Sequence, residues 1–318
     1  MSYFSIMFMM MYLSSFLLIL SNDSWFLLWV GLEINMLSFI MLVYEKSIIN
    51  IEMCLKYFFI QGVGSALLLM VLIMKSIFYK EAVVMILSYK MGAGPFYFWF
   101  SIFCEGVSWN SCFLIMSIQK LVPLMILSLF ICSMVWLVML MSMVIGLFGC
   151  FNETKLKKFL AFSSIHYIGW MMLCMCVNSY LWVLYLIGYM FMLLGVLMSI
   201  KKKEIFMVSD FLNFKNPFLF LYSMLNMGGM PPMLGFFLKW WVFLKVLSFH
   251  IWLVWLVITL AVIMFYVYMR MVYHIVVGYN FSYLYMSQDM YLFSMSSKEW
   301  IYVLGMVVTP VLGWSLFM

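Results

Sequence analysis

The sequence predicts an all-α membrane protein of about eleven transmembrane helices, and two observations support this fold class. Hydrophobic residues make up 68% of the chain, charged residues only 9%, and the mean hydropathy is +1.15, values far outside the range of soluble domains. Apolar segments long enough to cross about 30 Å of hydrocarbon recur along the whole chain, separated by short loops. A β-barrel would instead show alternating segments of about ten residues, which the sequence lacks.

No stretch is polar enough for a separate soluble domain, so residues 1–318 are expected to form a single transmembrane domain. The longest hydrophilic segment, about residues 278–298, still carries Tyr, Phe and Met and is predicted to be an interfacial loop. The predicted spans, in order, are residues 4–20, 25–44, 56–78, 82–99, 107–132, 134–147, 159–177, 181–200, 217–247, 251–273 and 300–316.

Positive charge gathers at the span ends on one predicted side of the membrane, whereas the other side receives Lys80 and little else. Excess positive charge marks the side of insertion, which is the cytoplasm or the matrix of an organelle, and the N-terminus is predicted on that side. The apolar start has no positive n-region or cleavage site and is expected to be a retained first helix. The net charge of +6 is interpreted as a topology and lipid signal, not as nucleic-acid binding. The basic residues on the charged side are Lys46, Lys56, Lys155, Lys157, Lys158, Lys201, Lys202, Lys203, Lys215, Arg270 and Lys298.

The sequence gives no sign of a cofactor or metal site. Its seven cysteines are scattered, and only Cys174 and Cys176 come near the close spacing of iron–sulfur or zinc ligands. There is no GxGxxG after a strand and no Walker loop. We therefore expect structural thiols, and no cofactor or metal bound by this chain.

Four charged residues fall deep inside predicted spans: Glu33, Lys90, Lys120 and Lys239. Glu33 lies at least about 12 Å from either end of its span at 1.5 Å per residue. A buried ion costs at least a few kcal/mol in a spanning helix, so each of the four needs a partner, water or a change of protonation. One acid and three bases at depth indicate a proton path, and a structural ion pair is the alternative. Lysines near span ends are expected to snorkel to the interface; these are Lys56, Lys75 and Lys245.

Glycine and proline interrupt two of these spans beside a lysine. Residues 92–95 contain Gly92, Gly94 and Pro95 just after Lys90, and residues 228–232 contain two glycines and two prolines before Lys239. Because proline removes a backbone donor, both helices are predicted to be discontinuous inside the membrane. The break follows the lysine in the first span and precedes it in the second. This opposite order is typical of two halves related as an inverted repeat, with ion sites beside unwound helices.

Six motifs resemble the subunit 2 family of mitochondrial NADH:ubiquinone oxidoreductase (respiratory complex I), one of the antiporter-like membrane subunits. They recur in the family's order over residues 27–240, most of the chain. The motifs are LLWVGLEINMLSFI (27–40), KYFFIQG (56–62), KMGAGPFYFW (90–99), QKLVPL (119–124), FNETKLKKFLAFSSIHYIGWM (151–171) and GGMPPMLGFFLKW (228–240).

The resemblance implies an antiporter-like fold in its N-terminally shortened animal form and a proton-translocating role in the mitochondrial inner membrane. Glu33 and Lys90 correspond to the family's glutamate–lysine pair, Lys120 to its central lysine and Lys239 to its terminal lysine. The resemblance also implies that NADH, FMN, iron–sulfur clusters and ubiquinone belong to other subunits, which supply redox energy and pack as obligate partners. Tyr97 replaces the family's histidine, which places a proton route through that position in doubt.

The resulting hypothesis is that Glu33 controls the charge of Lys90 and that the proton then passes through Lys120 to Lys239. Hydroxyl and imidazole groups on residues 163–167 are candidate lesser members of the water chain: Ser163, Ser164, His166 and Tyr167. A stand-alone cation/proton antiporter and a structural scaffold remain as alternatives. The basic loops at residues 155–158 and 201–203 are candidate sites for anionic phospholipid such as cardiolipin.

Overall fold

The computed structural model describes residues 3–21, 24–74, 77–177, 180–200, 218–247, 251–285 and 303. Every regular element in this part of the chain is a helix, which confirms the all-α prediction. The elements are α1 (Tyr3–Ser21), α2 (Trp25–Val43), α3 (Ile48–Met74), α4 (Tyr79–Met91), α5 (Phe98–Gly106), α6 (Trp109–Met116), η1 (Ile118–Lys120), α7 (Leu121–Leu129), α8 (Ser133–Asn152), α9 (Leu156–Val177), α10 (Leu181–Ile200), α11 (Phe218–Gly228), α12 (Leu234–Val246) and α13 (Ile251–Tyr285).

Seven described segments are long and apolar enough to cross a membrane, and a shorter apolar helix covers Ser5–Ser21. The chain is therefore a multi-pass membrane protein. Two of the predicted spans, residues 82–99 and 217–247, are divided into shorter helices. The last predicted span, residues 300–316, lies outside the described residues except for Val303.

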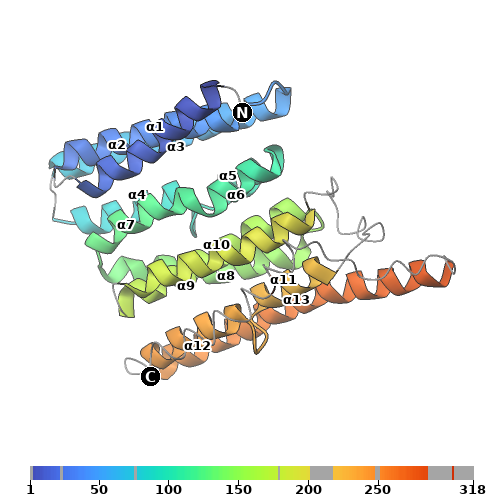
Figure 1. Cartoon of the computed structure of the whole chain (residues 1–318). Coiled ribbons are helices and arrows are strands. Elements are labelled where there is room, and N and C mark those ends of the chain that lie inside the picture. Colours follow the sequence, from blue (N-terminus) through green and yellow to red (C-terminus); the bar gives the residue numbers. More distant parts are fainter. Residues whose placement is uncertain are drawn as a thin grey trace. The chain divides into compact units, whose positions relative to one another are not determined.

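The chain forms two compact units, which are described separately. The first consists of Met1–Gly146 and Ala161–Cys176, and the second of Leu147–Leu160 and Val177–Met318, so the boundary passes through α8 and α9. In the first unit α1, α2 and α3 run side by side, α3 also contacts α4 and α5, and α4 contacts α7 (Figure 1). In the second unit α10 packs against α11 and α12, and α13 packs against the same two helices.

Helix α3 begins earlier than the predicted span at residues 56–78. The side chain of Ser47 accepts a hydrogen bond from the backbone N–H of Asn50 at 3.2 Å, which is the geometry of an N-cap. Lys56 consequently lies in the third turn, where its half-exposed side chain pairs with Glu52 at 2.5 Å. The prediction that Lys56 heads a helix was therefore wrong, because the cap at Ser47 allows the polar first turns to be helical.

The span predicted at residues 107–132 is also interrupted, at a place that the sequence analysis did not identify. Helix α6 ends at Met116, Ser117 leaves helical geometry with φ −118° and ψ −82°, and η1 precedes α7. Pro123 explains the break, because proline has no N–H for the carbonyl of Gln119 and its ring crowds that carbonyl. The break therefore falls directly before Lys120.

Helix α13 continues twelve residues past the predicted end of its span at residue 273 and reaches Tyr285. The first part of the predicted interfacial loop at 278–298 is thus helical, which corrects that prediction. No proline interrupts residues 274–285, and a single glycine costs a helix only about 1 kcal/mol. Residues 286–298 lie outside the described part of the chain.

Candidate functional site

Lys90 lies in the last turn of α4, directly before the predicted break. Gly92 ends the helix in left-handed geometry at φ +66°, and a Cβ there would come within 2.5 Å of the Phe100 Cβ. The N–H groups of Gly92 and Ala93 return to carbonyls of the last α4 turn at 3.2 and 2.9 Å, as at other glycine-capped helix ends. The break predicted after Lys90 is therefore confirmed.

Helix α3 fixes the position of Lys90. The Gln61 amide donates a hydrogen bond to the Lys90 carbonyl at 2.9 Å. The Lys90 stem lies against Gly64, where a Cβ would sit only 3.0 Å from its Cγ and 3.1 Å from its Cε. The side chain is 6% exposed, and the described residues provide its Nζ with no hydrogen bond or ion pair. Lys90 is also one of the residues that line a cavity.

Glu33 lies on α2 and is only partly buried. The Ser65 hydroxyl of α3 donates a hydrogen bond to its Oε1. Glu33 and Lys90 are close enough to interact electrostatically, yet in the described chain they form no ion pair within 4.0 Å. The structure thus places the two predicted partners near each other but not in an ion pair.

Lys120 ends η1 and is 2% exposed. Its Nζ donates a hydrogen bond to the backbone carbonyl of Ser164 at 3.0 Å and lies 5.1 Å from the centroid of the Phe100 ring. A carbonyl dipole and the face of an aromatic ring both favour a cation. Both contacts therefore favour the charged form of Lys120.

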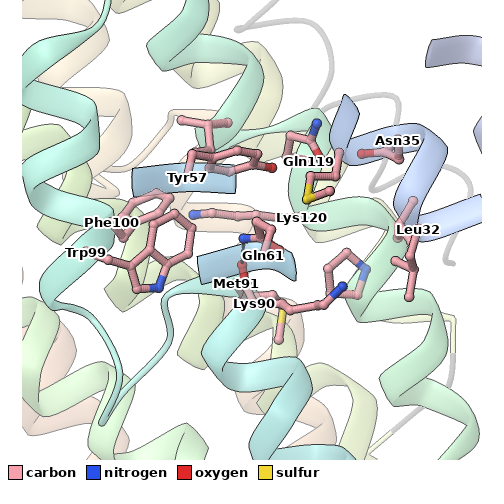
Figure 2. Close-up of a pocket in the computed structure, with 14 residues that line it drawn as sticks. Leu32, Asn35, Tyr57, Gln61, Lys90, Met91, Trp99, Phe100, Gln119 and Lys120 are labelled. Atoms are coloured by element: carbon pink, nitrogen blue, oxygen red, sulfur yellow. Dashed lines mark hydrogen bonds between the residues drawn. The ribbon is translucent and has the colours of Figure 1, made fainter. Parts of the chain in front are cut away.

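A cavity of about 30 Å³ has both Lys90 and Lys120 in its wall (Figure 2). A water molecule needs about 10–15 Å³ by this measure and two or more polar partners, so the cavity has room for two or three waters. Gln119 also lines it, and its buried Nε2 has no hydrogen-bond partner in the described part of the chain. The full lining is Leu32, Asn35, Met36, Tyr57, Gln61, Lys90, Met91, Trp99, Phe100, Ile115, Gln119, Lys120, Val122 and Pro123.

Lys239 belongs to the second unit and to the other predicted break. Helix α11 ends at Gly228, Gly229 is left-handed at φ +85°, and α12 begins at Leu234, so this break is confirmed as well. The buried Lys239 Nζ donates a hydrogen bond to the Gly228 carbonyl at 2.8 Å. That carbonyl lies at the helix C-terminus, where no intrahelical partner exists and the dipole favours a cation.

Residue Asn226 holds the two halves of this break together. Its side-chain oxygen accepts a hydrogen bond from the N–H of Gly235 at 2.9 Å, which caps α12 from the preceding helix. A Cβ at position 235 would come within 1.9 Å of the Asn226 carbonyl, so only glycine permits this close approach. The lysine is thereby carried on a short helix anchored at its N-terminus.

The candidate lesser members of the water chain have mainly structural contacts. Ser164 offers Lys120 its carbonyl, while its hydroxyl bonds to Ala161 at 2.7 Å. The His166 Nε2 accepts from the Trp170 indole at 3.1 Å, so Nδ1 carries the proton and donates to the Met143 carbonyl at 3.1 Å. Both imidazole nitrogens are thus engaged. Tyr97 stacks on Phe98 with ring centroids 4.1 Å apart and does not line the cavity.

Three residues of the site were not predicted from the sequence: Gln61, Ser65 and Gln119. Gly64 and Ser65 lie three and four residues after Gln61 within an apolar span, and this spacing places all three on one helix face. That pattern could have identified the α3 face. Within the described residues no three His, Cys, Asp or Glu side chains come together as a metal site.

Comparison with known proteins gives a consistent match. The family model described as NADH:quinone oxidoreductase/Mrp antiporter, TM matches residues 74–264. The NADH-ubiquinone oxidoreductase chain 2 of Anopheles gambiae is 35% identical over 288 residues, covering 84% of each chain. The same protein of Lemur catta is 32% identical over 282 residues, covering 81% of each chain.

Two solved structures share the fold. A chain of respiratory complex I from Thermus thermophilus superposes with a TM-score of 0.76 at 20% identity, covering 98% of this chain and 77% of that one. A chain of the Mrp complex from Dietzia sp. DQ12-45-1b gives a TM-score of 0.66 at 15% identity, covering 80% and 56%. These likenesses show that the described helices adopt an antiporter-like fold.

Proposed function

The chain belongs to the NADH-ubiquinone oxidoreductase chain 2 family, and from this premise we propose that its buried lysines carry the protons. It is a proton-translocating membrane subunit of that H⁺-translocating enzyme. In our proposal Lys90, Lys120 and Lys239 hold and pass the protons, and Glu33 controls the charge of Lys90.

The cavity between Lys90 and Lys120 is the observation that carries the proposal. A proton cannot cross an apolar gap, whereas a short chain of waters can pass it between two amines. Lys90 lines the cavity and the described residues give its Nζ no hydrogen-bond partner, so a water is the proposed partner. A dry structural scaffold has no need for a cavity that buried lysine and glutamine side chains line together.

The transfer is balanced in protons. An N–H bond of the Lys90 ammonium breaks as a cavity water gains that proton, and the water passes another of its protons to the neutral amine of Lys120. Lys120 then holds the charge against the Ser164 carbonyl and the face of Phe100. Lys90 is left neutral and ready to be protonated again.

Glu33 sets the direction of this transfer. An anion near an amine favours the protonated amine, and removal of the anion favours release of the proton. The carboxylate is held by Ser65 at a distance from Lys90 at which it acts electrostatically without forming an ion pair. A small displacement of Glu33 is therefore enough to change the charge of Lys90.

Lys239 serves as the terminal site of the path in the second unit. Its contact with the Gly228 carbonyl at the end of α11 stabilises the protonated amine. The proton of that amine can then be passed to a neighbouring subunit or to the opposite face. The break leaves backbone groups that only protein or water can satisfy at this depth. Such a site suits the exchange of a proton with water.

The energy comes from redox chemistry in other subunits, which hold NADH, FMN, the iron–sulfur clusters and ubiquinone. We place the chain in the mitochondrial inner membrane as an obligate partner of other membrane-arm subunits, with its N-terminus on the matrix side. Anionic phospholipid such as cardiolipin is proposed to bind the basic loops.

The first test is Lys90→Met in the assembled complex. Methionine keeps most of the length and removes the ionisable group, so the number of protons moved per electron is expected to fall while the complex still assembles. The measurement is the proton-to-electron ratio in vesicles energised with NADH.

Lys56→Met is the matched control, because Lys56 is half-exposed and paired only with Glu52 on its own helix face. It should leave the ratio unchanged. A normal ratio in the Lys90→Met complex would remove Lys90 from the path and the proposal with it.

A further inference from the structure

The Glu33 carboxylate and the Lys90 ammonium attract each other, yet in the described chain they are more than 4.0 Å apart. Another contact must therefore hold the Glu33 carboxylate away from the Lys90 ammonium. Among the described side chains, Ser65 on α3 is the one that contacts Glu33 through a hydrogen bond, and residues of the same α3 face contact Lys90.

We propose that Ser65 is a positioning residue that holds the Glu33 carboxylate away from Lys90 and releases it when its hydroxyl turns to the Gly62 carbonyl. This inference rests on the proposed function, because it supplies the displacement of Glu33 that the proton path requires.

The two acceptors of the hydroxyl are the basis of this inference. Ser65 Oγ lies within hydrogen-bond distance of Glu33 Oε1 and also 2.9 Å from the Gly62 carbonyl of its own helix. A serine hydroxyl has one proton to donate, so a full bond to one acceptor weakens the bond to the other. The bond to an anionic carboxylate is the stronger of the two, so it holds Glu33 in place until the hydroxyl turns to the Gly62 carbonyl.

Lys90 is the fixed member of the pair. The Gln61 amide holds its carbonyl at 2.9 Å, and the absence of a side chain at Gly64 allows its stem to lie directly on α3. Glu33 is attached to α2, and among the described residues its hydrogen bond to α3 is the one from Ser65. When that bond opens, the carboxylate is therefore the group that moves toward the ammonium.

The experiment uses Ser65→Ala in the assembled complex. Glu33 has two arrangements in this proposal, one bonded to Ser65 and one paired with Lys90. Loss of a hydrogen bond to a charged group shifts the balance between them roughly ten- to hundredfold, so Glu33 should move to the arrangement paired with Lys90. A high-resolution map should show its carboxylate within 4.0 Å of Lys90 Nζ. NADH-driven proton translocation should slow, because Lys90 stays charged.

Two further variants separate positioning from packing. Ser65→Thr restores a hydroxyl that can bond to a carbonyl one turn back, and it should recover translocation. Ser142→Ala removes another fully buried serine hydroxyl, which bonds to Met139 on its own helix at 2.8 Å, and it should have no effect. Ser65→Cys, which keeps the volume and weakens the donor, replaces the alanine variant if that complex does not assemble.

Unchanged translocation in Ser65→Ala, or an unmoved Glu33, overturns the role of Ser65. If Lys90→Met still lowers the proton-to-electron ratio in that case, the proposed function stands and only this inference fails. If Lys90→Met leaves the ratio normal, the proposed function itself fails.

Discussion

Gln119 lines the cavity, and its buried Nε2 has no hydrogen-bond partner among the described residues. A buried amide that donates no bond costs about 1–3 kcal/mol, so a water is expected against it. Lys90 and Lys120 line the same cavity, so in the proposed path this water belongs to the chain that joins them. Gln119 cannot ionise, and its proposed role is to orient that water.

Replacing Gln119 by Met is expected to slow NADH-driven proton translocation roughly two- to tenfold, the effect of one neutral hydrogen bond on a rate. Methionine has a similar length and no donor. The initial rate of proton movement in energised vesicles measures the effect. Met36→Leu, which changes the shape of the same cavity without changing its polarity, is the control, and an equal loss in both variants would contradict a role for the amide.

At the scale of the elements, each of the three buried lysines lies next to an interrupted helix. Lys90 precedes the α4–α5 break, Lys120 follows the turn at Ser117, and Lys239 follows the α11–α12 break. Helix ends expose carbonyl groups and a partial negative charge. Interrupting a helix is therefore a way to place a counter-charge inside the membrane without a second ionised side chain, as the Gly228 carbonyl does for Lys239.

The break in the second unit depends on the left-handed conformation of Gly229 at φ +85°. Gly229→Ala is expected to destabilise this unit by about 1–2 kcal/mol and to press a Cβ within 3.1 Å of Lys239 Nζ. Both a lower unfolding temperature of the assembled complex and a lower proton-to-electron ratio should follow. Gly62→Ala is the matched control, because a Cβ at that helical position meets nothing within 4 Å and alanine favours the helix. Equal thermal stability of the two variants would be evidence against strain at Gly229.

At the scale of the whole molecule, each compact unit contains one confirmed break and its lysine. A stand-alone cation/proton antiporter could use the same groups. In the proposed function, by contrast, redox energy from other subunits drives the lysines and reaches them as a change of conformation or charge.

The chain purified apart from its redox partners is therefore expected to move no protons against a gradient. The measurement reconstitutes it in vesicles, imposes a sodium or potassium gradient and follows the internal pH with a dye. The intact complex energised with NADH in the same vesicles is the control. Steady cation-driven proton exchange by the isolated chain would favour the antiporter alternative.

Much of the fold could be predicted because the bilayer imposes simple rules on the sequence. Apolar length identified the helices, and the glycine and proline clusters at residues 92–95 and 228–232 located two breaks. The third break was missed because its proline, Pro123, lies two residues inside α7, a position that helices tolerate. The early start of α3 was missed because a single Ser47 cap changes which polar residues are helical.

The sequence by itself determined the class of the protein and the identity of its buried charges, because a charge in hydrocarbon is too costly to occur without a reason. The tertiary structure decided which of those charges meet. It gathers Glu33, Lys90 and Lys120 in one unit, bonds Glu33 to Ser65 without pairing it to Lys90 among the described residues, and brings both lysines to the wall of one cavity. Distances between residues on different helices depend on how the helix faces pack, and hydropathy carries no information about that packing.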